Sequence, residues 1–436
     1  MERKEIYSLK KWKNSARRKP LIIRGARQVG KTWLMKEFGK KEYEQLVYIN
    51  FEISKHLGQI FEPNFDIKRI LTALQIETGV TCYPESTLII FDEIQEAPAA
   101  LTSLKYFYED APEYHVIAAG SLLGVALNQN ISFPVGKVDF LDLFPLNFTE
   151  FLAALGQKKL IMLLENEEWD LIKTFNNKYI DLLKQYYYVG GMPEPVNTFC
   201  KDNDLKKVRE IQKNILQAYE QDFSKHAPLS IVPRIRMLWN SIPAQLSKEN
   251  RKFIYGIIKK GARAKDYEIA LSWLIDCGLV HKVNRVTKPA IPLKAYFDFS
   301  AFKLFIVDTG LLAAMGNIDA KSLLKGNMIF EEFKGAITEQ FVLQQLLTIK
   351  EFDIFYWSTE KSSAELDFLL QTENKIIPIE VKAEENLQAK SLKVYHQKYK
   401  PKISIRTSMS DFRKESWLIN IPLYAINQLA NTNILD

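Results

Sequence analysis

The sequence predicts an α/β fold in which a parallel sheet, covered by helices on both faces, fills the first third of the chain. Short apolar runs bounded by charge, glycine or proline alternate there with helix-like segments, which is the pattern of a parallel sheet. The chain has 436 residues, of which 47% are hydrophobic and 25% charged, so it holds enough apolar material for several cores. The expected strands are residues 21–24, 46–50, 88–91, 116–119 and 138–141.

Composition excludes several classes of protein. The net charge of +7, from 59 basic and 52 acidic residues, permits a nucleic-acid partner without requiring one. Cys82, Cys200 and Cys277 lie far apart, so they form neither a disulfide framework nor a zinc-ligand spacing, and we expect a cytoplasmic protein. No stretch approaches about 20 consecutive apolar residues, so we expect no membrane span.

The pattern changes after this sheet. Apolar residues recur at helical spacing from about 148 to 219, interrupted by a turn at Gly190 and Gly191. Helix-like stretches then precede two β-like runs, at 279–286 and 296–307. The helix expected at 265–277 should bury Ile269, Ala270, Trp273 and Leu274.

A helix opens the last part of the chain, from about residue 329, and includes Glu339. The strand-like runs that follow are residues 354–357, 366–370, 376–381 and 403–406, with a hairpin turn near Asn374. The changes of pattern give three predicted domains, at 1–225, 226–325 and 326–436.

A glycine-rich loop between the first strand and a helix at 32–38 has the spacing G-x-x-x-x-G-K-T. Its glycines let backbone N–H groups point at phosphate oxygens, and the helix N-terminus adds positive potential. Lys31 can reach the β- and γ-phosphates, and Thr32 can place its hydroxyl on Mg²⁺. We therefore expect ATP with Mg²⁺. The nucleotide-binding residues are Gly25, Ala26, Arg27, Gln28, Val29, Gly30, Lys31 and Thr32.

Two carboxylates, Asp92 and Glu93, end the strand at 88–91. In such a site Asp92 holds Mg²⁺ through water and Glu93 polarises the attacking water, although acidic residues also simply cap strand ends. Ser121 follows the next strand and has two interpretations, a sensor of the γ-phosphate or the N-cap of a short helix. Arg24 and Arg27 flank the loop. Each could contact a phosphate or could be a solvated charge on the surface.

These motifs resemble the signature blocks of a large group of prokaryotic AAA-type P-loop ATPases. Their C-terminal domain, of unknown function, looks like a restriction endonuclease. The resemblance implies nucleotide sites between protomers, which is compatible with a homo-oligomer. Many members have Gly-Arg where this chain has Gly136-Lys137, and lysine lacks arginine's bidentate contact with phosphate. The blocks that carry the resemblance are residues 24–32, 91–95, 119–121, 143–148 and 190–194.

Residues 248–307 are similar to the winged-helix modules of such ATPases, with helices followed by a two-stranded wing. A DNA-reading role would put the first half of the helix at 265–277 in a major groove. That half carries Lys265 but also Asp266 and Glu268, which would face phosphate unfavourably. A packing or interaction role therefore stays as open as a DNA-reading role.

The last domain carries Asp367 and, thirteen positions later, Glu380-Val381-Lys382. Alternation along a strand puts Glu380 and Lys382 on one face, and a hairpin could bring Asp367 beside them. Two carboxylates suit Mg²⁺, Lys382 can act on a water or on phosphate charge, and Glu339 could supply a third carboxylate. The order resembles the D…E-x-K pattern of restriction-endonuclease-like proteins.

Together these patterns predict an ATP-binding, ATP-hydrolysing AAA-type protein whose nucleotide state controls a C-terminal Mg²⁺-dependent nuclease-like domain acting on nucleic acid. The alternative is a regulatory or interaction ATPase whose nuclease-like domain binds DNA or protein without cleavage. A third hypothesis is a nucleotide-dependent scaffold with a decayed AAA site.

Overall fold

The computed structural model describes residues 2–62, 64–120, 133–248, 252–325, 331–359, 364–385, 388–430 and 434. The chain forms two compact units, residues 2–144 with 276–279 and residues 145–275 with 280–436. The three-part division expected from the sequence stays a prediction. Among the described residues, no helix has the length and apolarity needed to cross a membrane.

The first unit is a five-stranded sheet with helices on both faces. The strand order is β2-β3-β4-β1-β5, and every neighbouring pair is parallel. Each of the five strands overlaps a run predicted from the sequence, so the α/β class is confirmed. The elements are α1 (Glu5–Lys13), β1 (Leu21–Arg24), α2 (Lys31–Glu42), β2 (Gln45–Asn50), η1 (Lys55–Phe61), α3 (Ile67–Thr78), β3 (Thr87–Asp92), η2 (Ile94–Glu96), α4 (Pro98–Asp110), β4 (His115–Ala119) and β5 (Asp139–Asp142).

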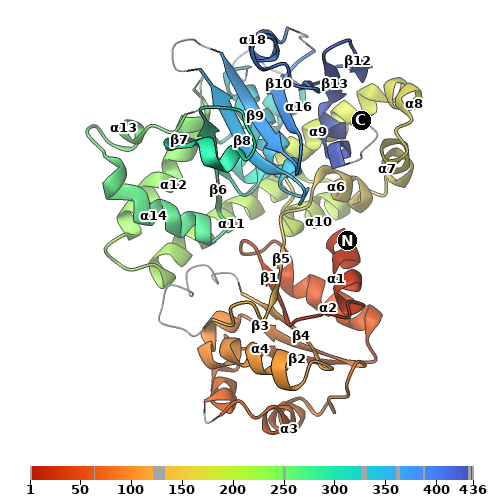
Figure 1. The fold of residues 1–436 in the computed structure, drawn as a ribbon, viewed down its shortest axis with the longest axis vertical. Helices are drawn as coiled ribbons and strands as arrows, with labels where there is room; N and C mark the ends of the chain where they lie inside the picture. Colours follow the sequence, from red (N-terminus) through yellow and green to blue (C-terminus); the bar gives the residue numbers. More distant parts are fainter. Residues whose placement is uncertain are drawn as a thin grey trace. The chain divides into compact units, whose positions relative to one another are not determined.

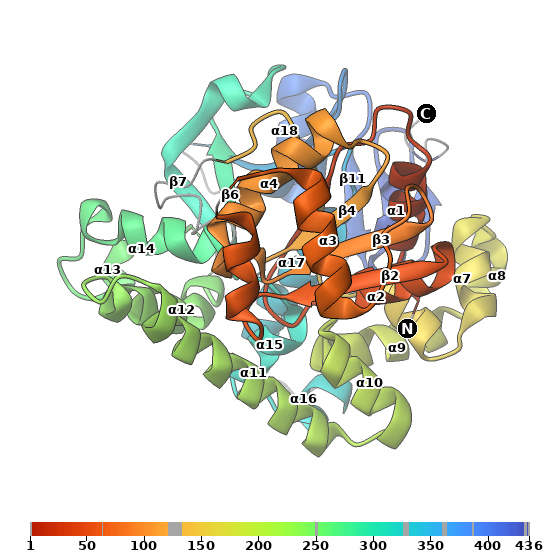
Figure 2. The ribbon, with the colours of Figure 1, turned by 90° about the horizontal axis from the view of Figure 1, so that it is seen from below.

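Strand β3 is buried along its whole length because helices cover both of its faces. Ile89 and Phe91 belong to a core cluster with α3 and α4, which Figure 2 shows next to each other. On the other face, Gly39 of α2 packs so closely that an added Cβ would lie 3.3 Å from the side chain of Leu88. The continuous apolar run of β3 follows from this two-sided burial.

The second unit combines a helical layer with a mixed eight-stranded sheet of order β12-β13-β11-β10-β9-β8-β6-β7. Figure 1 shows β8, β9 and β10 of this sheet as neighbouring blue arrows. Its helices are α6 (Phe148–Ala154), α7 (Lys158–Glu165), α8 (Trp169–Thr174), α9 (Asn176–Val189), α10 (Pro193–Asp202), α11 (Leu205–His226), α12 (Val232–Leu246), α13 (Tyr255–Ile258), α14 (Ala264–Asp276), η3 (Leu293–Tyr296), α15 (Thr309–Met315), α16 (Ala320–Lys325), α17 (Glu331–Leu346), α18 (Lys390–Tyr399) and η5 (Leu423–Ala430). Its strands are β6 (Val280–Val286), β7 (Phe297–Ile306), β8 (Asp353–Ser358), β9 (Glu365–Gln371), β10 (Ile376–Val381), β11 (Ile405–Ser408), β12 (Arg413–Lys414) and β13 (Ile419–Pro422).

The hairpin expected as a free wing is part of this larger sheet. Strands β6 and β7 pair antiparallel after α12, α13 and α14, in the order expected of a winged helix, but β6 also pairs parallel with β8 through Arg285 and Val286. The winged-helix resemblance stays a prediction. One expectation for α14 is wrong: Ile269 is 69% exposed, while Ala270, Trp273 and Leu274 are buried.

The glycine turn predicted at 190–191 has a packing role. The backbone N–H of Leu146 donates to the carbonyl oxygen of Gly191 (2.7 Å), and the N–H of Gly191 donates to the buried carboxylate of Asp308 (2.6 Å). A Cβ on Gly191 would lie 2.0 Å from the carbonyl oxygen of Leu146, and one on Gly190 would lie 2.2 Å from Asp308. Only glycine fits both positions, so this motif belongs to the core.

Candidate functional site

The loop after β1 turns tightly enough to direct its backbone toward an anion. Gly25 has φ of 147°, and a Cβ there would lie 2.2 Å from the carbonyl oxygen of Leu143. Gln28 and Gly30 also have positive φ, 64° and 98°, and Gly30 is the N-cap of α2. Gly30 has no side-chain oxygen to cap the first N–H groups of α2, and such groups favour a negatively charged partner.

The side chain of Lys31 folds back onto the glycine-rich loop that precedes it. Its ammonium donates to the carbonyl oxygens of Gly25 and Ala26, both at 2.8 Å, and the residue is 6% exposed. Burial lowers the pKa of Lys31 to about 8, and the nearby carboxylates of Glu93 and Asp92 offset part of that fall. A phosphate group would replace two neutral acceptors by a charged one and would favour the protonated lysine.

The carboxylate of Asp92 is held beside the start of α2. Its Oδ2 accepts from the hydroxyl of Thr32 (2.7 Å) and from the hydroxyl of Tyr48 (2.9 Å), and the residue is 1% exposed. A hydroxyl next to a buried carboxylate is the oxygen pair that Mg²⁺ takes from a P-loop protein. These residues therefore fit the ion that the sequence predicts.

Tyr48 was not predicted as a site residue. The parallel register of β2 and β3 sets Asn50 opposite Asp92, and Tyr48 lies two residues earlier on β2. Burial raises the pKa of Tyr48 to about 12, so it stays a hydrogen-bond donor to Asp92 over the physiological range. The ammonium of Lys36 lies 3.5 Å from the centre of its ring.

Glu93 follows Asp92 in a backbone conformation that is rare for its residue type. Its φ of 50° and ψ of 47° lie in the left-handed region, which costs free energy for a residue with a Cβ. The side-chain amide of Gln95 donates to Glu93 Oε2 at 2.7 Å and fixes the carboxylate. Strain of this kind often occurs at functional sites, in agreement with the catalytic role expected for Glu93.

Arg3 holds the loop from the N-terminal segment, and nothing in the sequence pattern identified it. Its guanidinium donates to the carbonyl oxygens of Val29 (3.0 Å) and Phe144 (2.6 Å). The Arg3 side chain is 3% exposed and lies 3.6 Å from the carboxylate of Glu5. The two hydrogen bonds tie the loop to the segment that follows β5.

The two arginines that flank the loop have carboxylate partners in the structure. Arg24 makes a bidentate contact with Asp142, at 2.8 and 2.9 Å, and lies over the ring of Phe140. Arg27 lies 3.8 Å from Glu52, in a pair that is less exposed than that of Arg24 and Asp142. Of the two interpretations offered for Arg24, the structure favours a surface ion pair.

Two further positions concern charge near the γ-phosphate. Lys137, at the position where the resemblance implied an arginine, pairs with Glu109 at 2.9 Å on the surface. Ser121 lies outside the described residues, so both of its interpretations stay open.

The hairpin of β9 and β10 brings together the residues expected of a nuclease-like site. Asp367 accepts a hydrogen bond from the N–H of Val381 (2.7 Å). Glu380 accepts from the ammonium of Lys382 (2.8 Å) through one oxygen and from the N–H of Leu392 (3.0 Å) through the other. Burial raises the pKa of Glu380, and Lys382 offsets part of the rise.

A lysine that the sequence analysis did not identify lies among these carboxylates. The ammonium of Lys303, on β7, lies 2.6 Å from Glu365, 3.5 Å from Glu339 and 3.9 Å from Asp367. Its side chain is fully buried, whereas that of Glu365 is 19% exposed. Lys303 therefore supplies positive charge to the cluster from inside the protein.

The residues of this cluster fit a bound Mg²⁺ poorly. A divalent cation on Glu339 or Asp367 would share its ligands with the buried ammonium of Lys303, which lies within 4 Å of both carboxylates, and the two positive charges would repel each other. Within the described part of the chain, no three aspartate, glutamate, histidine or cysteine side chains are arranged to hold one metal ion.

Comparison with known families assigns the first unit. Residues 17–152 match the model of an AAA domain, so this chain contains an AAA-type P-loop domain. Residues 180–322 and 334–425 match two domains of unknown function, DUF8612 and DUF4143. No curated protein matches the chain.

Two solved archaeal structures are among those similar to this chain. The Walker-type ATPase PABY2304 of Pyrococcus abyssi is 16% identical, with 72% of this chain and 94% of that chain covered and a TM-score of 0.46. The Aeropyrum pernix ORC1 protein in complex with DNA is 12% identical, with 72% and 91% covered and a TM-score of 0.31. These scores are too low to carry an inference, so the assignment rests on the AAA family model and on the sheet.

Proposed function

We propose that this chain, which contains an AAA domain, binds and hydrolyses ATP with Mg²⁺, and that its second unit binds a partner without cutting it. The observation that carries the ATPase proposal is the hydrogen bond between Thr32 and Asp92, beside the buried ammonium of Lys31. The loop, the lysine, the hydroxyl and the carboxylate are the parts that P-loop hydrolysis requires.

The roles of the residues follow from their contacts. Lys31 exchanges the carbonyl oxygens of its own loop for the β- and γ-phosphates, while the N–H groups of α2 point at the same anion. Mg²⁺, when bound, neutralises charge on these phosphates, with Thr32 and Asp92 as its protein ligands. Glu93, held by Gln95, orients the attacking water and accepts its proton.

Binding of labelled ATP by the full chain tests this proposal. Lys31→Ala should abolish measurable affinity, because the phosphates lose their only buried cationic partner in the described loop. Lys40→Ala is the matched control, since Lys40 is an exposed lysine on the same helix. Equal affinity of wild type and Lys31→Ala would remove the ATP proposal.

Because AAA-type sites often need a cation from a neighbouring subunit, we also propose a homo-oligomer. Measuring the mass of the particle in solution with and without ATP would test this.

A second candidate function is an ATP-controlled nuclease with Asp367 and Glu380 as metal ligands, Glu339 as a third ligand and Lys382 as the catalytic lysine. The close pairing of Glu380 with Lys382 favours it. The position of Lys303 favours the binding role instead, because its ammonium supplies the charge that a metal would bring. Incubation of the full chain with ATP, Mg²⁺ and DNA or RNA separates the two, since only the nuclease yields cut products.

A further inference from the structure

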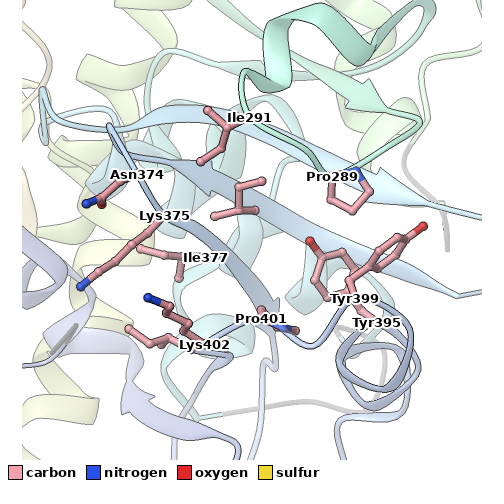
Figure 3. A pocket seen from close by; sticks show the side chains of 11 residues that line it. Pro289, Ile291, Asn374, Lys375, Ile377, Tyr395, Tyr399, Pro401 and Lys402 are labelled. Carbon is pink, nitrogen blue, oxygen red and sulfur yellow. The ribbon is translucent and has the colours of Figure 1, made fainter.

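A small hollow opens on the second unit where β10 begins and α18 ends. It has a volume of about 200 Å³ and is walled by apolar and aromatic side chains with two lysines. Figure 3 shows Lys375 and Lys402 on one side of it and the rings of Tyr395 and Tyr399 on the other. The full lining is Pro289, Ile291, Asn374, Lys375, Ile376, Ile377, Tyr395, Tyr399, Pro401, Lys402 and Ile403, and we call it the basic hollow.

The basic hollow is separate from the carboxylate cluster. Its β10 residues, Ile376 and Ile377, are at the start of the strand, whereas Glu380 is near the end. At about 3.3 Å per residue, the two places are roughly 10 Å apart along β10. No acidic side chain is among the residues that line the hollow.

The aromatic wall of the hollow is held in place from behind. The ring of Trp357 meets Tyr395 edge to face at 5.1 Å and 81°, and meets Tyr399 at 5.7 Å and 88°. Tyr395 and Tyr399 also contact each other, with ring centres 4.9 Å apart. Rings fixed in this way lose little freedom when a flat ligand packs on them, which favours binding.

The segment that contributes Tyr395, Tyr399, Pro401 and Lys402 to the hollow is basic. The segment 388–410 has five lysines and one arginine and no acidic residue. In the structure, as far as it is described, the five lysines lie beyond ion-pair distance of any carboxylate. Such a surface attracts an anion with several charges spaced along it. The lysines are Lys390, Lys393, Lys398, Lys400 and Lys402.

We propose that the basic hollow binds single-stranded nucleic acid, with one base packed against Tyr399 and the neighbouring phosphates on Lys400, Lys402 and Lys375. Its volume is below the roughly 300–1,000 Å³ of sites for drug-sized ligands, which suits one base better than a whole cofactor. Bases of a duplex are stacked on each other, so only an unpaired strand can insert one. An acidic peptide without aromatic side chains, such as polyglutamate, would meet the lysines but has no flat ring to pack against Tyr399.

This inference names the partner of the binding role proposed above. The two can fail separately, because the assay below measures strand binding alone, without ATP. If the chain binds the strand but hydrolyses no ATP, the ATPase proposal is wrong and the proposed strand-binding role of the hollow stands. If the chain hydrolyses ATP but binds no strand, the proposed role of the hollow is wrong and the ATPase proposal stands.

Fluorescence anisotropy of the full chain with fluorescein-labelled oligothymidine tests the role of the aromatic wall. Tyr399→Ala should weaken binding about fivefold or more, the smaller effect expected for one lost stacking contact. Tyr399→Phe keeps the ring and should bind as wild type does. A thermal unfolding curve of each variant checks the fold. Equal affinity of wild type and a folded Tyr399→Ala chain would overturn the proposal.

The lysines are tested by the salt dependence of the same binding. Lys400→Gln with Lys402→Gln should lower the slope of log affinity against log salt by about 1.4, at about 0.7 per phosphate contact on single strands. Lys158→Gln with Lys159→Gln, a pair of exposed lysines on α7, removes the same charge elsewhere and should change little. An equal effect of both pairs would contradict the proposal. So would equal competition by duplex DNA or by polyglutamate.

Discussion

The hydroxyl of Thr32 donates a hydrogen bond of 2.7 Å to the carboxylate of Asp92, although the two residues lie 60 positions apart in the chain. Thr32 lies in the first turn of α2, and Asp92 ends the buried strand β3, which β4 separates from β1. The pair forms the proposed Mg²⁺ site, because a hydroxyl and a carboxylate at this distance can share one Mg²⁺.

Thr32→Ala should therefore weaken binding of ATP in the presence of Mg²⁺ by about tenfold or more, because one contact with a charged group contributes about 1.5–3 kcal/mol. The same variant should bind ATP in EDTA as wild type does. Isothermal titration under both conditions makes the measurement. Thr72→Ala removes an exposed threonine of α3 and serves as the control. Loss of equal size with and without Mg²⁺ would show that Thr32 acts on the loop and not on the metal.

The affinity for ATP should fall as pH rises above about 8. Burial lowers the pKa of Lys31 to about 8, so the ammonium of the free site loses its proton above that pH. Phosphate favours the charged lysine, and binding must then take up a proton, which weakens it by up to about tenfold per pH unit. Titrations from pH 8 to about 9.5 should show this fall.

Lys31→Arg provides the contrast for the pH series, because a guanidinium keeps its charge throughout this range. If the variant binds ATP, its affinity for ATP should not change with pH. A wild-type affinity for ATP that does not change with pH would contradict the claim that phosphate binding requires the protonated form of Lys31.

Arg3→Ala should lower both the unfolding temperature and the affinity for ATP. The carbonyl oxygens of Val29 and Phe144 lose a charged donor inside the protein, and each such hydrogen bond contributes about 1.5–3 kcal/mol. Chemical denaturation and ATP titration measure the two effects. Arg17→Ala, at an exposed arginine nearby in sequence, should change neither. Wild-type ATP affinity in Arg3→Ala would show that the clamp does not position the loop.

Lys303→Met should destabilise the second unit by about 3–5 kcal/mol, because it leaves the carboxylates around it without their buried cation. Adding Glu365→Gln to that variant should recover part of the loss. Lys294→Met removes a lysine that pairs with Asp353 while 66% exposed, and should cost less than about 1 kcal/mol. Denaturant unfolding gives these values, and similar losses for Lys303→Met and Lys294→Met would contradict the role of Lys303.

The sequence predicted those parts of the fold and site that lie close together in the chain. Strands β1 and β3 could be found because each is a short apolar run that ends in charge, and the loop at Gly25 because its spacing is continuous. The hairpin at Asn374 could be found because two strands flank a polar turn. The short strands β12 and β13 were not predicted: β12 has only two residues, both exposed, and β13 is a four-residue run that contains an asparagine and ends in proline.

Partners that reach a site from distant elements could not be predicted. Arg3 contacts Val29 from the segment before α1, Tyr48 contacts Asp92 through strand pairing, and Lys303 enters the carboxylate cluster from β7. Each is a common residue in an ordinary sequence context, and only the folded topology gives it a partner. The misplacement of Ile269 has the same origin, because helical spacing alone does not say which residue at the margin of an apolar stripe is covered.

Single-turnover and steady-state hydrolysis of ATP by Glu93→Gln tests the central claim most directly. The variant keeps the loop, Lys31, Thr32 and Asp92, so it should bind ATP with Mg²⁺ as wild type does. Without the carboxylate that accepts the proton of the attacking water, its hydrolysis rate should fall by about 10²-fold or more. Hydrolysis by Glu93→Gln at the wild-type rate would contradict the assignment of this site as the ATPase centre.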